Sequence, residues 1–184
     1  MKKPLLFAVF ALLAACGSNS TTTPTADSTR MKTDSVVAMR PIQSPYPILY
    51  SSSFVADDPK NAESLLAIWK AYDAGDFSTV RNLFADTVEV HLASGLTMRT
   101  SRDSTLAAVA AYRNSMKSAV SSISAIMAVK STDKDQHWAL IWGMEKDTHK
   151  NGKVDSTELQ ETWLFDNSGR ASLFYQYSAK PAMK

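Results

Sequence analysis

The strongest constraint on the fold is a long alternation of apolar and polar residues that is interrupted by Asn151-Gly152. It spans residues 137–165, HWALIWGMEKDTHKNGKVDSTELQETWLF. A period of two residues is typical of β-strands with one buried face, and Asn-Gly between two such runs is typical of a two-residue hairpin turn. The segment is therefore predicted to form two long antiparallel strands.

Elements on either side of the hairpin complete this pattern. Residues 122–130 and 171–179 alternate in the same way and are predicted strands. Before them, apolar residues recur at helical spacing in residues 58–75, in the short segment 77–86 and in the alanine-rich segment 101–120. Helices followed by antiparallel strands predict an α+β fold.

The first predicted helix has signals at both ends. Asp58 suits a cap for the first turn, Pro59 suits the first helical position, and Gly75 suits a left-handed stop. We expect one face of this helix to be buried. The residues on that face are Ala62, Leu65, Leu66, Trp69 and Tyr72.

The N-terminus, MKKPLLFAVFALLAAC, has a basic start, an apolar run and small residues before Cys16. This pattern is typical of a secretory signal peptide, and LAAC resembles the lipobox of bacterial lipoproteins, in which the cysteine is lipidated after cleavage. We expect residues 1–15 to be removed, the Ser-, Thr- and Pro-rich residues 16–45 to form a tether, and residues 46–184 to form one domain. Gly17 stands where an aspartate would resemble an inner-membrane retention signal, so we expect an outer-membrane anchor.

The charge pattern argues against nucleic acid as a partner. Once Lys2 and Lys3 leave with the signal peptide, 18 basic residues stand against 18 acidic ones. Lysines and arginines are scattered among acids and form no basic block, so the electrostatic footprint of a nucleic-acid-binding protein is missing.

The order of these segments resembles the nuclear transport factor 2-like superfamily and, more narrowly, a SnoaL-like domain. The resemblance covers about residues 46–180 and rests on YDAGDF, LFADTVEVHLASG and LQETWLFDNSGRASLFYQY. It implies a cone in which about three N-terminal helices pack on a curved antiparallel sheet, with a pocket at the wide end. Members include ketosteroid isomerases, polyketide cyclases, an epoxide hydrolase and binding domains without chemistry, so the resemblance does not select a reaction.

This resemblance locates the positions that carry chemistry in the ketosteroid isomerases. The general-base aspartate falls on Leu92, the first oxyanion tyrosine on Ile68, and the second oxyanion carboxylic acid on Glu161. Neither Leu92 nor Ile68 can carry a proton, and proton abstraction needs a base within reach. The isomerase mechanism is therefore not expected.

Glu161 is the candidate catalytic residue, because it is a lone carboxyl in the apolar strand face of Leu159, Trp163 and Phe165. One interpretation is a pocket acid whose pKa is raised by desolvation. The other is a carboxylate paired with an arginine or a tyrosine hydroxyl at the pocket mouth.

Aromatic side chains are the candidate ligand-binding residues. Trp138, Leu140, Trp142 and Met144 share a face of their strand, and the last strand adds Phe174, Tyr175 and Tyr177. These rings either line a site for a flat apolar ligand or simply fill the cone. The predicted lining residues are Trp69, Leu92, Trp138, Trp142, Trp163 and Tyr175.

His91 is predicted to be a surface or interface residue. In FADTVEVHLASG, residues 84–95, the apolar Val88, Val90 and Leu92 alternate with Glu89 and His91, so the polar pair points away from the cone interior. The histidines have no spacing that presents two metal ligands together, and we expect neither a metal nor another cofactor. The hairpin tip EKDTHKNGK is expected to be solvated.

The sequence leads to two hypotheses of function. The first is a membrane-anchored, periplasm-facing lipoprotein, non-catalytic or weakly catalytic, that binds a small apolar ligand or self-associates, as a homodimer, through its outer sheet face. The second is a lyase, isomerase or hydrolase with Glu161 as acid or base, in which Tyr175 or Trp163 positions the substrate.

Overall fold

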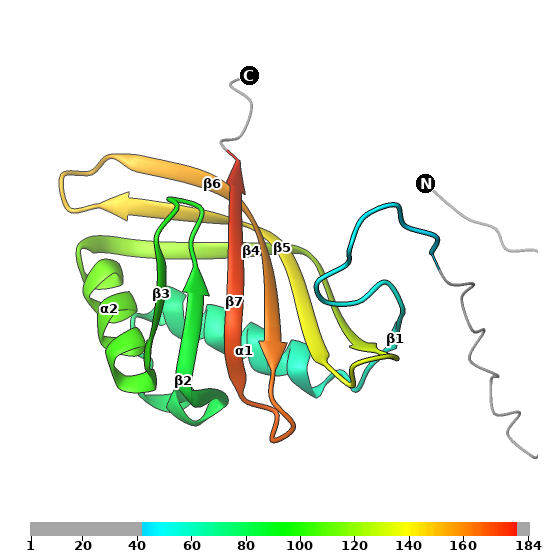
Figure 1. The fold of residues 1–184 in the computed structure, drawn as a ribbon. Helices are drawn as coiled ribbons and strands as arrows, with labels where there is room; N and C mark the ends of the chain where they lie inside the picture. The colour runs from blue at the N-terminus through cyan, green and yellow to red at the C-terminus, as the bar shows by residue number, and fades with distance from the viewer. Residues whose placement is uncertain (1–41, 180–184) are drawn as a thin grey trace, which may run out of the picture. The chain divides into compact units, whose positions relative to one another are not determined.

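The computed structural model of the protein describes residues 42–179 (Figure 1). The predicted signal peptide, Cys16 and tether residues 17–41 lie outside the described residues. In chain order the elements are β1 (Phe54–Ala56), α1 (Lys60–Ala74), the 3₁₀ helix η1 (Ser78–Leu83), β2 (Phe84–His91), β3 (Thr97–Ser101), α2 (Arg102–Asn114), β4 (Met116–Ser131), β5 (His137–His149), β6 (Val154–Phe165) and β7 (Ala171–Ala179).

The strands of the described residues form one seven-stranded sheet in the order β1-β4-β5-β6-β7-β2-β3. β2 and β7 pair in parallel, and the other neighbouring strands are antiparallel. The sheet is curved (Figure 1), and α1 packs mainly against β4 and β5, whereas α2 packs against β2, β3 and β4. The predicted curved sheet with helices packed on it is therefore confirmed.

α1 begins and ends where its sequence predicts. Asp58 Oδ1 accepts the backbone N–H of Lys60 (2.9 Å), and Gly75 adopts the left-handed conformation with a φ of 72°. Leu66, which was expected on the buried face, is exposed instead. The face that enters the core carries Ala62, Leu65, Ile68 and Trp69. Neither α-helix of the described residues is long and apolar enough to cross a membrane.

Two predicted helices differ from the structure. Residues 77–86 form a 3₁₀ helix only as far as Leu83, where β2 takes over. α2 ends at Asn114 instead of continuing to residue 120, and β4 begins at Met116. The serine and β-branched residues after Met116 favour an extended backbone over a helix. The short strands β1 and β3 were not predicted, since they are held by pairing with β4 and β2.

Three hairpin loops share one geometry, with a glycine as the third loop residue. After β5, Gly152 donates its backbone N–H to the carbonyl of His149 (2.9 Å), and His149 donates to the carbonyl of Lys153 (2.8 Å). Gly152 has a φ of 87°, as expected for a type I turn that ends in a G1 bulge. The loops of Gly95 and Gly169 repeat this arrangement. The predicted β5–β6 hairpin is confirmed, but its loop has three residues, 150–152, rather than two.

Candidate functional site

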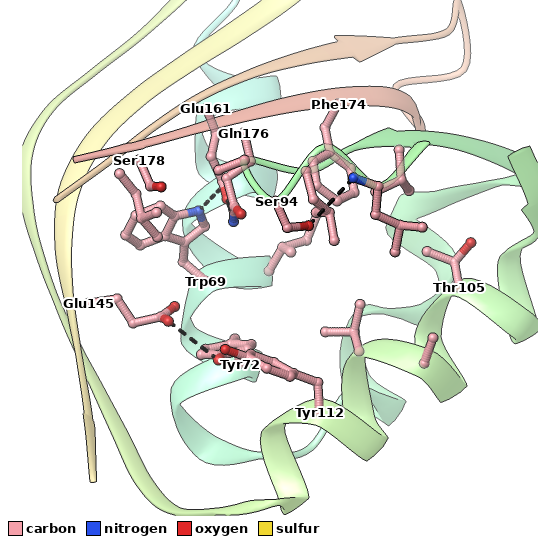
Figure 2. A pocket seen from close by; sticks show the side chains of 18 of the residues that line it. Trp69, Tyr72, Ser94, Thr105, Tyr112, Glu145, Glu161, Phe174, Gln176 and Ser178 are labelled. Carbon is pink, nitrogen blue, oxygen red and sulfur yellow. Dashed lines mark hydrogen bonds between the residues drawn. The ribbon is translucent and has the colours of Figure 1, made fainter. Parts of the chain in front are cut away.

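A cavity of about 630 Å³ lies between the helices and the concave face of the sheet (Figure 2). Its size and its largely apolar wall with a few polar groups are typical of a small-molecule site. Four of the residues predicted from the sequence line it, namely Trp69, Leu92, Glu161 and Trp163. Its polar lining residues are Tyr72, Ser94, Thr105, Tyr112, Ser121, Glu145, Asp147, Thr157, Glu161, Gln176 and Ser178.

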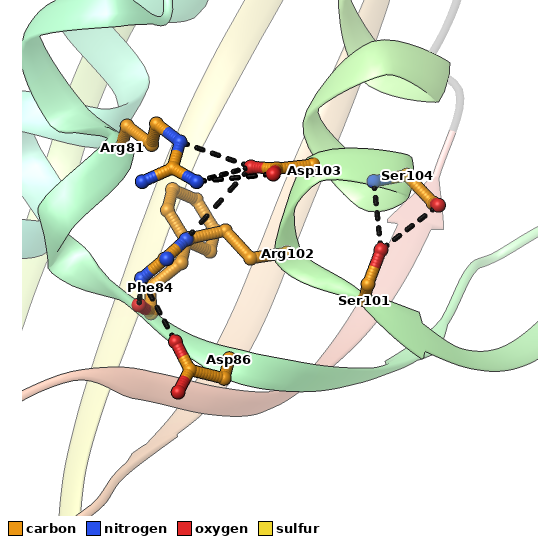
Figure 3. Close-up of polar contacts among 7 residues, drawn as sticks. All are labelled: Arg81, Phe84, Asp86, Ser101, Arg102, Asp103 and Ser104. Carbon is orange, nitrogen blue, oxygen red and sulfur yellow. Dashed lines mark hydrogen bonds and ion pairs between the residues drawn. The ribbon is translucent and has the colours of Figure 1, made fainter.

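The start of α2, which forms one wall of the cavity, is held by a cap and by ion pairs (Figure 3). Ser101 Oγ accepts a backbone N–H of the first turn (3.2 Å). Arg81 of η1 donates to both carboxylate oxygens of Asp103 (2.9 and 3.0 Å), and Arg102 donates to the backbone carbonyl of Phe84 (3.2 Å). These contacts attach α2 to η1 and to the start of β2.

Glu161 lies on β6 with its carboxyl group buried in the cavity wall. Its Oε2 accepts the indole N–H groups of Trp69 (2.8 Å) and Trp163 (2.9 Å), and Oε1 accepts the side-chain amide of Gln176 (3.0 Å). Burial raises the pKa of Glu161, and the three donors act in the opposite direction. Its partners are thus N–H groups, not the arginine or tyrosine hydroxyl of one sequence-based interpretation. The geometry gives Glu161 a role in holding the two indoles.

Two further carboxyl groups, which were expected on a solvated hairpin tip, line the same cavity. Glu145 and Asp147 alternate along β5 with Ile141 and Gly143, so they share the concave face. Burial and the neighbouring Asp147 raise the pKa of Glu145 to about 8, and burial also raises the pKa of Asp147. The Tyr72 hydroxyl donates to Glu145 over 3.4 Å. Continuing the alternation from Ile141 would have found both carboxyl groups.

The hairpin loop decides which side chains of β5 face the cavity. With three loop residues, Ile141 lies opposite Glu161. A two-residue loop would shift the register by one position and place Trp142 there, and such a shift moves every side chain to the other face. Trp138 and Trp142 therefore lie on the outer face of the sheet and, contrary to expectation, do not line this cavity.

Tyr175, also predicted to line the cavity, belongs to a separate cluster on the outer face. Its hydroxyl lies 2.6 Å from the hydroxyl of Tyr50, and the Tyr50 ring packs edge-on against Trp138 with centroids 4.9 Å apart. Tyr50 and Trp138 line a shallow depression of about 420 Å³. The predicted ligand-binding residues are thus divided between the two faces of the sheet.

His91 points away from the cavity, as the alternation of β2 predicts. Its Nε2 lies 2.8 Å from Glu89 Oε1, and its ring stacks on Tyr175 with centroids 4.4 Å apart. Val88 and Val90 are buried on the other face of the strand. Within residues 42–179, no group of three or more His, Cys, Asp or Glu side chains is arranged to hold a metal ion.

No protein-family model matches the sequence, and no curated protein matches it. Solved structures resemble the fold. An NTF2-like protein of unknown function from Exiguobacterium sp. 255-15 gives a TM-score of 0.52 at 13% identity, over 63% of this chain and 98% of that chain. AusH from Aspergillus nidulans gives 0.54 at 10% identity, over 71% and 90%. The epoxide hydrolase/cyclase-like enzyme SalBIII, which acts in pyran ring formation in the polyether salinomycin, gives 0.53 at 12% identity, over 67% and 93%.

These likenesses define the class by its fold. The chain has an NTF2-like fold, with the cavity on the concave side of the sheet. At such low sequence identities these proteins share only the fold with this chain. The evidence for function therefore comes from the residues and geometry of the cavity.

Proposed function

We propose that this chain is a SnoaL-like, lipid-anchored protein of the cell envelope whose cavity binds a small, largely apolar molecule. The observation that carries the binding function is the cavity, because about 630 Å³ of space remains inside a wall that Glu161 holds in place. If the aromatic side chains simply filled the interior of the fold, this space would not remain. SalBIII provides an analogy, since that enzyme has a role in pyran ring formation in a polyether.

A neutral apolar dye, N-phenyl-1-naphthylamine, tests this proposal. We expect one dye molecule to bind per protein with a rise in fluorescence. Val109→Trp on α2 should lower the affinity at least tenfold, because Val109 lines the cavity and the indole fills it. Val120→Trp is the matched control, since Val120 is 62% exposed on β4 and outside the lining. Equal binding by both variants, or no binding by the unmodified protein, contradicts a ligand site in the cavity.

Acid–base catalysis is the second candidate function, as a lyase, isomerase or hydrolase. It is favoured by Glu145, because a pKa of about 8 suits proton transfer near neutral pH. Glu161, the group that the sequence favoured, already accepts three N–H groups. If a substrate is turned over, Glu145→Gln should lower the rate by about 10²-fold or more. A rate within about threefold of the unmodified protein contradicts acid–base chemistry at Glu145.

The membrane anchor is the part of the proposal that rests on the sequence pattern around Cys16. Cys16 lipidation predicts labelling by an alkyne analogue of palmitate and sedimentation with outer-membrane vesicles. Cys16→Ser should lose both properties. An unlabelled protein with an unprocessed N-terminus contradicts the anchor.

Self-association through the outer sheet face is the alternative to ligand binding. Met127 and Tyr177 are exposed there, at 46% and 58%. Light scattering on Cys16→Ser protein should then give the mass of a homodimer, and Tyr177→Lys should give the mass of a monomer. A monomeric mass for both proteins contradicts this alternative.

A further inference from the structure

Two carboxyl groups from one strand stand at one end of the cavity. Glu145 and Asp147 are two positions apart on β5, so both side chains leave the strand on its concave face. Both line the cavity. Tyr72 and Tyr112 lie beside Glu145 (Figure 2). Glu145 and Asp147 thus form a carboxyl pair in the cavity wall.

Asp147 has a buried oxygen that no nitrogen or hydroxyl group reaches. The residue is 8% exposed, its Oδ1 accepts no N–H or hydroxyl group of the described residues, and its side chain shares a hydrogen bond with the Glu145 carboxyl group. Burying a carboxylate oxygen without a donor is costly, and such atoms in folded proteins are normally paired. With Glu145 protonated, the proton of this carboxyl pair is the donor that Asp147 has, and a ligand in the cavity meets both residues because both line it.

The cavity wall offers no positive charge of its own. Among the described residues that line it, none is a lysine, an arginine or a histidine. Arg113 of α2 lies close enough to lower the pKa of Asp147. Its guanidinium group, however, donates to the backbone carbonyls of Tyr72 (2.9 Å) and Asp73 (3.0 Å) at the end of α1. Arg113 therefore offsets only part of the negative charge of the carboxyl pair.

The other titratable groups around the carboxyl pair carry charges of both signs. Glu161 on β6 acts on Glu145, and Asp155 on β6 acts on Asp147, both with negative charge. His149 on β5 opposes them, but its Nε2 lies 2.8 Å from Asp155. From the helices, Tyr72 and Tyr112 contribute hydroxyl groups that are neutral at physiological pH, since burial raises the pKa of both. Glu161 and Asp155 are thus opposed by Arg113 and His149, and it is the carboxyl pair itself that favours a cation at this end of the cavity.

We propose that the ligand of this cavity carries a protonated amine, held between Glu145 and Asp147, on an apolar body. This inference rests on the proposed binding function. An ammonium group donates to the carboxyl pair in place of the proton that Glu145 shares with Asp147, and it offsets the charge of the pair. Aromatic rings close to the pair, those of Tyr72 and Tyr112, add an attraction for a cation. The apolar remainder of the cavity packs against the rest of the ligand.

Three probes with one naphthalene body test the amine: 2-naphthylmethylamine, 2-naphthylmethanol and 2-naphthoic acid. Their binding to the full-length protein is measured by calorimetry at neutral pH in two buffers of different ionisation enthalpy. We expect the amine to bind at least tenfold more tightly than the alcohol and the acid to bind most weakly. Below its pKa of about 8, Glu145 must lose a proton when a cation arrives. Amine binding should therefore release a proton, and alcohol binding should release none.

Variants that remove the charge of Glu145 or Asp147 at nearly constant side-chain size separate the effect of charge on amine binding from the effect of packing. Glu145→Gln and Asp147→Asn should each lower the ratio of amine to alcohol affinity at least fivefold, and Glu145→Gln should abolish proton release. The matched control is Glu158→Gln, because Glu158 is exposed on the outer face opposite Met144. It should leave the ratio and the proton release unchanged.

The outcomes distinguish the two proposals. An amine that binds no more tightly than the alcohol overturns the amine inference and leaves the binding function standing. Tightest binding by the acid, or an amine preference that persists in both carboxyl variants, also overturns it. Failure of all three probes to bind overturns the binding function and the amine inference together.

Discussion

Trp69 on α1 donates its indole N–H to Glu161 on β6 at 2.8 Å, across a sequence separation of 92 residues. The same carboxylate oxygen accepts the indole N–H of Trp163 at 2.9 Å. One carboxyl group therefore sets the positions of two rings in the cavity wall, and it links the first helix to the sheet.

Removal of the Glu161 carboxyl group should destabilise the fold. Glu161→Leu leaves the N–H groups of Trp69 and Trp163 buried without an acceptor, and we expect a loss on the order of 2–4 kcal/mol in the free energy of unfolding. Glu161→Gln keeps one acceptor oxygen for both indoles, so its loss should be about 1 kcal/mol. Urea denaturation measures both. Equal losses would show that these hydrogen bonds do not carry the stabilisation.

Gly143 is required where α1 approaches β5. A Cβ atom at this position would lie 2.6 Å from the backbone oxygen of Ser122 and 2.9 Å from Trp69 Cζ3. Since backbone cannot move aside easily, Gly143→Ala should cost about 2–3 kcal/mol of stability. Gly95→Ala is the control, because it meets no atom within 4 Å and suffers only from its positive φ. That strain is worth about 1 kcal/mol. Thermal denaturation that ranks Gly95→Ala as the more damaging change would contradict the close approach.

Stability should fall as pH rises through the titration range of Glu145. Its pKa rises from an ordinary 4.5 to about 8 in the folded protein, chiefly through burial. Between these values the folded state binds the proton more tightly than the unfolded state, so the free energy of unfolding decreases with pH. We expect a decrease on the order of 2 kcal/mol across this window, measured by urea denaturation. Glu145→Gln should reduce the slope, with the share that the raised pKa values of Asp147 and Glu161 contribute remaining, whereas Glu158→Gln should keep the whole slope. A slope that is unchanged in Glu145→Gln would refute the raised pKa.

Tyr50 shields Trp138 on the outer face of the sheet. The two rings lie edge-on with centroids 4.9 Å apart. Tyr50→Ala should therefore increase the quenching of tryptophan fluorescence by acrylamide. Tyr50→Phe keeps the ring and loses only the hydroxyl contact with Tyr175, so its quenching should stay near that of the unmodified protein. Identical quenching in Tyr50→Ala would mean that this contact does not protect Trp138.

Elements with local signals were predicted correctly from the sequence. Asp58 and Gly75 bound α1 because caps act within a few residues of the helix end. The β5–β6 hairpin and the inward face of β2 follow from alternation, which also places His91 outside the cavity. Glu161 was found as a lone carboxyl in an apolar strand face, and the structure places it in the cavity wall.

Only the tertiary structure decided which face of β5 lines the cavity. A loop of three residues instead of two differs by one position in register, and local turn preferences barely distinguish the two. That one position moves Trp138 and Trp142 to the outer face and brings Glu145 and Asp147 into the cavity. The raised pKa of Glu145 also depends on burial between β5 and helices distant in the chain. The sequence thus determined the elements, because their signals are local, and the packing between distant segments determined the chemistry of the site.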